Sequence, residues 1–317
     1  MSRAFVFPGQ GAQTIGMGRD LAEASAAARA VFETVDDALG ERLSALIWEG
    51  EIERLTLTEN AQPALMATSL AAMAALGEAG VTVEHAAFVA GHSLGEYSAL
   101  CAAGALDLAD TARLLRIRGR AMQAAVPVGE GAMAALLGLD LAGARAVAEA
   151  AARETGAVCA AANDNDPAQV VVSGARRAVE RALDLAKEAG AKRALLLPVS
   201  APFHCALMQP AAEAMAEALA EVDIRAPRVP VVANVTAAPE SDPARIRALL
   251  VDQITGAVRW RESVAAMVAR GVTEFWEIGA GKALSGMIRR IAREAETRTL
   301  GTAAEVTAAV ESMTGGN

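Results

Sequence analysis

A strand, a tight turn and a helix are predicted by the segment Phe88-Val89-Ala90-Gly91-His92-Ser93-Leu94-Gly95-Glu96-Tyr97-Ser98. Its first part is apolar and strand-like, and a helical run follows its Gly91-x-Ser93-x-Gly95 segment. Glycines allow the chain to bend tightly between a strand and a helix, and the serine of such a turn lies at the helix N-terminus. Free N–H groups there favour a developing negative charge. Ser93 is therefore a candidate nucleophile, and a structural turn that happens to contain serine is the alternative.

Outward from this turn, strand-like runs alternate with helical ones along the chain, which predicts an α/β fold with a mainly parallel sheet. We expect strands over residues 5–7, 86–90, 229–233 and 274–278. We expect helices over residues 60–78, 108–125, 206–222 and 282–293.

The middle of the chain has a pattern of its own. Strands are predicted at 133–137, 158–162, 170–173 and 194–199, with helices at 142–153 and 175–189. This βαββαβ order is the ferredoxin-like motif, which forms a compact unit by itself. Pro127 and Gly129 precede it and Pro202 follows it. We therefore predict an inserted domain over residues 127–199, with a substrate cleft at its boundary with the rest of the chain.

Composition excludes several classes of protein. A net charge of -9 argues against nucleic acid as a partner, because phosphate binding needs a basic surface. The apolar stretches are too short to predict a membrane span, and the start of the chain does not resemble a signal peptide. Three cysteines without metal-ligand spacing predict no metal site and a cytoplasmic location.

A serine hydroxyl needs a base, and the chain has only three histidines. His92 is adjacent to Ser93, so its side chain leaves the bent backbone in another direction. His85 lies roughly 26 Å away if the intervening strand is extended at ~3.3 Å per residue. His204 follows the predicted insertion and lies beside the predicted cleft. Elimination favours His204 as the base.

Arg118 lies on the apolar side of the predicted helix over residues 108–125, unlike Arg113, Arg116 and Arg120, which are expected on a solvated face. A buried guanidinium needs an anionic partner. That partner is either an internal aspartate or glutamate, or the carboxylate of a substrate held through two parallel hydrogen bonds.

Two glycine-rich loops invite a nucleotide-binding interpretation. Gly9-Gln10-Gly11 follows a strand, but the third glycine of the dinucleotide fingerprint is replaced by Thr14. The loop ending in Gly281-Lys282 lacks the first glycine and the hydroxyl residue of a P-loop. Both interpretations fail on spacing, so no cofactor is expected.

Taken together, these segments resemble the malonyl-CoA:acyl carrier protein transacylase family over nearly the whole chain. The resemblance rests on the opening loop from Phe5 to Gln13, the motif Gly91 to Tyr97, Arg118-Gly119, the segment Asn163 to Val171, Phe203-His204, and Glu277 to Lys282. It implies that residues 1–126 and 200–317 form a large α/β-hydrolase-like catalytic domain, with residues 127–199 inserted as the ferredoxin-like small domain.

The resemblance also implies roles for named residues. Ser93 and His204 would carry out two-step covalent catalysis, with Arg118 binding the substrate carboxylate. The backbone N–H groups of Gln10 and Leu94 would form the oxyanion hole. The main-chain carbonyl of Gln253 would orient the histidine, and Phe203 and His92 would shape the acyl pocket. Arg259 stands where relatives often have a neutral residue, and the sequence assigns it no role.

The implied substrates are malonyl-CoA and acyl carrier protein, and the protein is expected to be a monomer. Basic residues that could contact an acidic carrier protein are Lys187, Lys192, Arg193, Lys282, Arg289 and Arg290. An α/β hydrolase is the competing enzyme class, but it predicts a histidine late in the chain. A catalytically silent scaffold is the third alternative. A chain without fused synthase modules favours fatty acid synthesis over a polyketide pathway.

Overall fold

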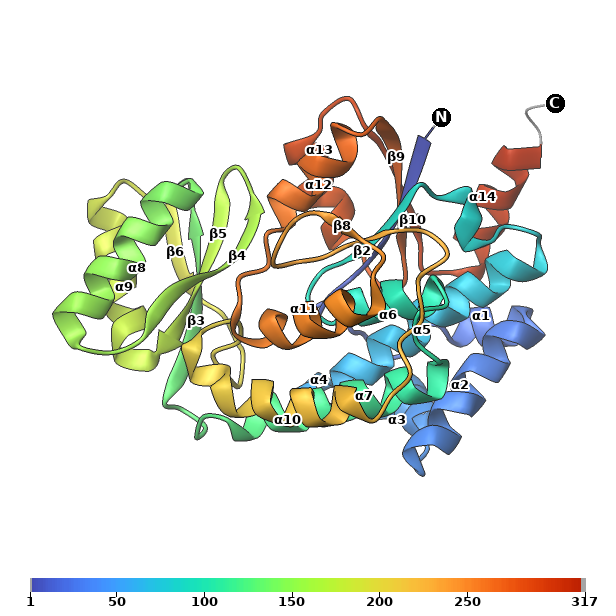
Figure 1. Ribbon diagram of the computed structural model, residues 1–317, viewed down its shortest axis with the longest axis horizontal. Helices are drawn as coiled ribbons and strands as arrows, with labels where there is room; N and C mark the ends of the chain where they lie inside the picture. The colour runs from blue at the N-terminus through green and yellow to red at the C-terminus, as the bar shows by residue number, and fades with distance from the viewer. Residues whose placement is uncertain (1, 315–317) are drawn as a thin grey trace.

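The computed structural model describes residues 2–314, in which two separate β-sheets are covered by helices (Figure 1). The larger sheet has the strand order β10-β9-β1-β2-β7-β8, and all its pairs are parallel except β7 with β8. Its strands are β1 (Ser2–Phe7), β2 (Phe88–Gly91), β7 (Val231–Val232), β8 (Pro239–Glu240), β9 (Val272–Ile278) and β10 (Glu296–Leu300). The predicted mixed α/β class with a mainly parallel sheet is confirmed.

Helices cover both faces of this sheet because successive side chains of each strand point to opposite faces. In β1, Ala4 and Val6 pack with α12 (Trp260–Val268) and α13 (Ala283–Ile291). Phe5 and Phe7 face the larger core on the other side. That core is built by α1 (Arg19–Ala24), α2 (Ala26–Leu39), α3 (Leu43–Glu49), α4 (Ile52–Thr56), α5 (Thr58–Glu78), α6 (Gly95–Ala102), α7 (Leu108–Ala124), α10 (Gln209–Ala220), α11 (Pro243–Thr255) and α14 (Ala303–Thr314).

The second sheet is antiparallel and lies, with α8 (Leu141–Thr155) and α9 (Arg176–Glu188), at the opposite end of the molecule from α14 (Figure 1). Its strand order is β4-β5-β3-β6. The strands are β3 (Gly131–Leu137), β4 (Cys159–Asp166), β5 (Gln169–Ala175) and β6 (Arg193–Leu196). Leu136, Val147, Val172 and Val179 belong to an apolar core separate from that of the larger sheet. The element order predicted for this stretch is present.

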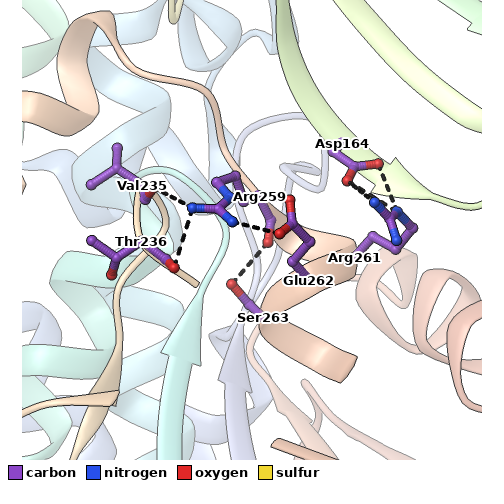
Figure 2. A network of polar contacts seen from close by, with 7 residues as sticks. All are labelled: Asp164, Val235, Thr236, Arg259, Arg261, Glu262 and Ser263. Carbon is purple, nitrogen blue, oxygen red and sulfur yellow. Dashed lines mark hydrogen bonds and ion pairs between the residues drawn. The ribbon is translucent and has the colours of Figure 1, made fainter. Parts of the chain in front are cut away.

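The segment that leads into α12 joins the two sheets (Figure 2). The Val258 N–H donates to Ala162 O of β4, and Asp164 N–H donates back to Val258 O. Arg261 pairs with Asp164, which is 2% exposed. Arg259 turns the other way, where its guanidinium donates to the carbonyl oxygens of Val235 and Thr236 and pairs with Glu262. Arg259, to which the sequence assigned no role, therefore holds the loop after β7 in place.

A second ion pair reinforces this junction from α13. Arg290 donates to Asp166 of β4 at 2.7 Å, and that carboxylate is 1% exposed. Asp164 and Asp166 lie two positions apart on one strand, and both pair with arginines of the larger unit. The position of β4 relative to the larger sheet is therefore fixed by buried, charge-assisted contacts on α12 and α13.

Some expectations differ from the structure. Arg116 is not on a solvated face: it is 6% exposed and bonds to Glu41 and Asn60, because α2 and α5 pack over that side of α7. The strand predicted from residue 86 begins at Phe88, since the 3-10 helix η1 (Val83–His85) precedes it. The helix predicted from residue 206 begins with the 3-10 turn η2 (Ala206–Met208), and α10 starts at Gln209.

No helix within residues 2–314 combines the length and apolar character that a bilayer crossing requires.

Candidate active site

Ser93 lies at the turn between β2 and α6, with φ of 53°. This left-handed conformation is costly for a residue other than glycine and is held by its surroundings. A Cβ at Gly91 would lie 1.8 Å from the carbonyl carbon of Gly95, and a Cβ at Gly95 would lie 2.2 Å from Phe7 O. The two glycines are thus required by close backbone approach. The predicted strand–turn–helix at the serine is confirmed.

Asn234, just after β7, holds the turn in place. Its side-chain oxygen accepts from the Ser93 N–H at 2.8 Å, and its side-chain nitrogen donates to Gly91 O at 2.7 Å. Both partners are backbone groups of fixed polarity, so the orientation of the amide follows from them. Asn234 was not among the residues predicted for the site. Its position after a predicted strand at the carboxyl edge of a parallel sheet, beside the end of β2, is the signal that points to it.

The structure brings His204 to the serine, 111 positions away in the chain. The imidazole Nε2 lies 2.8 Å from Ser93 Oγ, and Nδ1 lies 2.9 Å from the main-chain oxygen of Gln253. Because a carbonyl oxygen can only accept, Nδ1 carries the proton and Nε2 is left to accept from the serine hydroxyl. The arrangement suits proton removal from Ser93, with a carbonyl in place of the usual acid.

Burial, reinforced by the positive charge of Arg118 and by His92, lowers the pKa of His204 to about 3. The imidazole is therefore neutral over the whole physiological range and ready to take a proton. The other two histidines bond elsewhere. His85 is exposed and its Nδ1 contacts Thr82, while His92 Nε2 lies 2.8 Å from Asn165 Oδ1 of β4.

Arg118 is buried in α7, 1% exposed, and reaches the same point. Its guanidinium donates to Gln62 Oε1 at 2.7 Å, to Gln253 Oε1 at 2.8 Å and to Ser93 Oγ at 3.1 Å. All three acceptors are neutral, and its Nε has no partner. In the described part of the chain no carboxylate lies within ion-pair distance of Arg118. Of the two alternatives for its partner, the internal aspartate or glutamate is not found.

A buried cation without an anion is costly, and burial lowers the pKa of Arg118 from its usual value. A guanidinium nevertheless keeps its proton in proteins. The site therefore holds a positive charge without a direct anionic partner, 3.1 Å from the nucleophilic oxygen. An anionic ligand placed there would relieve the cost of burial.

These residues open into a cavity of 490 Å³ between the two sheets. The side facing the larger sheet includes Gln10, Ser93, Leu94 and His204, and β4 and β5 supply Asn163, Asn165, Gln169 and Val171. Phe203 and His92, which were predicted to shape the acyl pocket, line the same space. A cleft is thus present between the two sheets.

Two backbone donors lie beside the serine without partners. Neither the Gln10 N–H nor the Leu94 N–H makes a hydrogen bond within residues 2–314. Leu94 directly precedes α6, so its N–H belongs to the helix end that favours negative charge. Unpaired donors next to a nucleophile have the character of an oxyanion hole. No group of three histidine, cysteine or acidic side chains in these residues could hold a metal ion.

The profile of the acyl transferase domain family matches residues 4–310. A malonyl CoA-acyl carrier protein transacylase of Bacillus subtilis is 49% identical over 294 residues, which is 93% of this chain and 92% of the relative.

Two solved structures are similar along their whole length. An acyl-carrier-protein-S-malonyltransferase of Bartonella henselae is 58% identical, with a TM-score of 0.96 and coverage of 99% of this chain and 100% of that one. A malonyl-transacylase in complex with a type II PKS acyl-carrier protein is 42% identical, with a TM-score of 0.95 and coverage of 98% and 100%. The chain belongs to the acyl transferase family, and within it to the malonyl CoA-acyl carrier protein transacylases.

Proposed function

We propose that this protein transfers the malonyl group of malonyl-CoA to the phosphopantetheine thiol of acyl carrier protein, through a malonyl ester on Ser93. The observation that carries the proposal is the position of Arg118. Its buried charge has no direct anionic partner and lies 3.1 Å from the nucleophile, where a three-carbon acyl group can place its free carboxylate. A hydrolase acting on neutral esters would have no use for this charge.

In the first half-reaction His204 Nε2 takes the hydroxyl proton while Ser93 Oγ attacks the thioester carbonyl. The N–H groups of Gln10 and Leu94 stabilise the oxyanion of the tetrahedral intermediate. The carbon–sulfur bond then breaks, and the proton on His204 passes to the sulfur of coenzyme A. Malonyl-Ser93 and free coenzyme A are the products.

The second half-reaction runs the same steps in reverse with a different thiol. The carrier protein's phosphopantetheine thiol gives its proton to His204 and attacks the malonyl ester. The carbon–oxygen bond to Ser93 breaks, and His204 returns the proton to the serine oxygen. No step needs a metal or an organic cofactor. The main-chain oxygen of Gln253 holds the imidazole in one tautomer throughout.

We also propose that residues 127–199 are an inserted ferredoxin-like domain, with residues 1–126 and 200–317 forming the catalytic domain. The antiparallel strand order and the separate apolar core of residues 131–196 support this division. The protein is expected to act as a monomer in the reducing cytoplasm, where its three free cysteines would remain reduced. Its acyl group is expected to supply fatty acid synthesis.

Ion pairs within the protein reduce the number of basic residues that are free to contact the carrier protein. Lys187 pairs with Asp184, and Arg290 pairs with the buried Asp166. Lys192, Arg193, Lys282 and Arg289 are exposed and have no ion pair in the part of the chain that the structure describes. These four are the cations left to attract an acidic partner.

The proposal is tested by mixing the protein with malonyl-CoA or acetyl-CoA and recording its intact mass over time. Malonyl-CoA should add one acyl group at Ser93, and acetyl-CoA should react much more slowly. Equal rates with the two thioesters would contradict the role given to Arg118. Carrier protein should then remove the adduct far faster than water does.

A further inference from the structure

Glu96 is a buried carboxylate that the reaction described above does not use. It lies in the first turn of α6, three residues after the nucleophile, and is 2% exposed. No ion pair compensates it within residues 2–314. Burial of a charged group without a cation is costly unless hydrogen bonds satisfy it. Such a group beside the nucleophile needs an explanation other than packing.

The hydrogen bonds of Glu96 lead to two residues that touch the active site. Its Oε2 accepts from the side-chain nitrogen of Gln253 at 2.8 Å and from the Asn234 N–H at 3.0 Å. Each donor is itself bonded to the nucleophile turn. Gln253 Nε2 also donates to Ser93 O at 3.1 Å, and the Asn234 side chain accepts from Ser93 N–H at 2.8 Å.

Gln253 is the more important of the two, because three residues of the reaction, Ser93, His204 and Arg118, bond to it. Its main-chain oxygen accepts from His204 Nδ1, and its side-chain oxygen accepts from Arg118 Nη2. Its side-chain nitrogen is the group that Glu96 holds. A carboxylate can only accept, so Glu96 favours the amide orientation that turns Gln253 Oε1 toward Arg118.

We propose that Glu96 is a positioning residue for malonyl transfer, which acts through Gln253 and Asn234 to fix His204, Arg118 and the Ser93 turn. The proposal rests on the function proposed above and identifies a further residue for it. An ionised carboxylate accepts hydrogen bonds more strongly than a protonated one. The negative charge of Glu96 should therefore matter, and not only its shape.

The charge state of Glu96 can be followed separately from that of its neighbours. Burial raises the pKa of Glu96 to about 7, although bonds from Gln253 and Asn234 and the charge of Arg118 oppose the change. Around it, the pKa of His204 is lowered to about 3, that of His92 is also lowered by burial, and that of Tyr97 is raised by burial. Among these groups only Glu96 has a pKa near neutral, so a change in rate there is expected to follow its ionisation.

The test is the rate of malonyl-Ser93 formation, measured by rapid quench and intact mass, between about pH 5 and about pH 9. For the natural protein the rate should rise about tenfold through a midpoint near pH 7, as Glu96 ionises. Glu96→Gln keeps the shape but not the charge. It should be about tenfold slower at about pH 8, with this step absent. Glu96→Asp keeps the charge and should retain a step.

Glu277→Gln is the matched control. Glu277 is also a buried glutamate without an ion pair in the described residues, and it accepts from the N–H groups of Leu284 and Ser285 at the start of α13. Its substitution should lower the melting temperature without moving the pH profile. The comparison separates the general effect of removing a buried carboxylate from the specific effect of removing the charge of Glu96.

The possible results divide clearly. A Glu96→Gln protein with the natural rate and pH profile overturns the inference. A slower Glu96→Gln protein that keeps the step near pH 7 also overturns it, because another group then carries the titration. If the natural protein forms no malonyl ester at all, the proposed function fails, and that outcome is distinguished by the unmodified mass of the natural protein.

Discussion

Replacing Arg118 is the perturbation that tests substrate choice. Arg118→Ala removes a guanidinium whose present acceptors, Gln62, Gln253 and Ser93, are all neutral. The substrate carboxylate would lose the cation that it meets in a buried site. Leaving one member of a buried ion pair without its partner costs about 3–5 kcal/mol. Because each 1.4 kcal/mol is about tenfold in rate, malonyl transfer should fall roughly 10²–10⁴-fold.

Acetyl transfer should respond in the opposite way. An acetyl group offers no carboxylate, so it leaves Arg118 buried without an anion and gains nothing from it. Removing the charge removes that penalty, and acetyl-enzyme formation should be retained or increase. Arg118→Lys keeps a charge but not the planar pair of donors, so it should recover only part of the malonyl preference.

The assay is a competition between malonyl-CoA and acetyl-CoA, read from the masses of the two acyl-enzymes. Arg120→Ala is the matched control, because Arg120 lies on the same helix but is exposed and paired with Glu59. It should change the preference less than about twofold. If Arg118→Ala lowers both acyl groups by the same factor, the arginine is structural and the reasoning is refuted.

Three further predictions concern the turn, the junction and the carrier protein. In Gly91→Ala the new Cβ would lie 1.8 Å from a backbone carbon. The free energy of unfolding, measured in urea, should therefore fall by about 3 kcal/mol or more. An unchanged midpoint of the urea transition would contradict this prediction. Arg261→Met should lower the free energy of unfolding by about 2–3 kcal/mol, and Arg259→Met should lower it by about 1 kcal/mol. The difference arises because Arg261 pairs with a buried carboxylate, whereas the partner of Arg259 is partly exposed. The reverse order would be contrary evidence. Charge reversal at Lys192 and Arg193 should raise KM for carrier protein and spare malonyl-enzyme formation; equal loss in both half-reactions would argue against docking there.

Local signals in the sequence predicted the fold well. The glycines at 91 and 95 predicted the strand–turn–helix, since steric crowding at this turn leaves room for nothing larger. Helical and strand-like runs located α5, α7 and the elements of the second sheet. Short or polar elements, such as β8 with two residues and β10 with the sequence Glu-Thr-Arg-Thr-Leu, were missed because too few apolar side chains mark them.

The candidate site was predictable only where a residue type was rare or out of place. His204 emerged because just three histidines exist, and Arg118 because it fell on an apolar helix face. Glu96 and the side chain of Gln253 could not be found this way. They act through contacts 138 to 160 positions apart in the chain, and common polar residues carry no local mark of such contacts.

In the proposed reaction Ser93 carries the malonyl group as an ester. The most direct measurement is the intact mass of the protein and of Ser93→Ala after mixing with malonyl-CoA, followed by peptide mapping of the adduct. The natural protein should gain about 86 Da at Ser93, as ester formation requires, and Ser93→Ala should gain nothing. An undiminished adduct on Ser93→Ala, or an adduct mapped to another residue, would contradict the account.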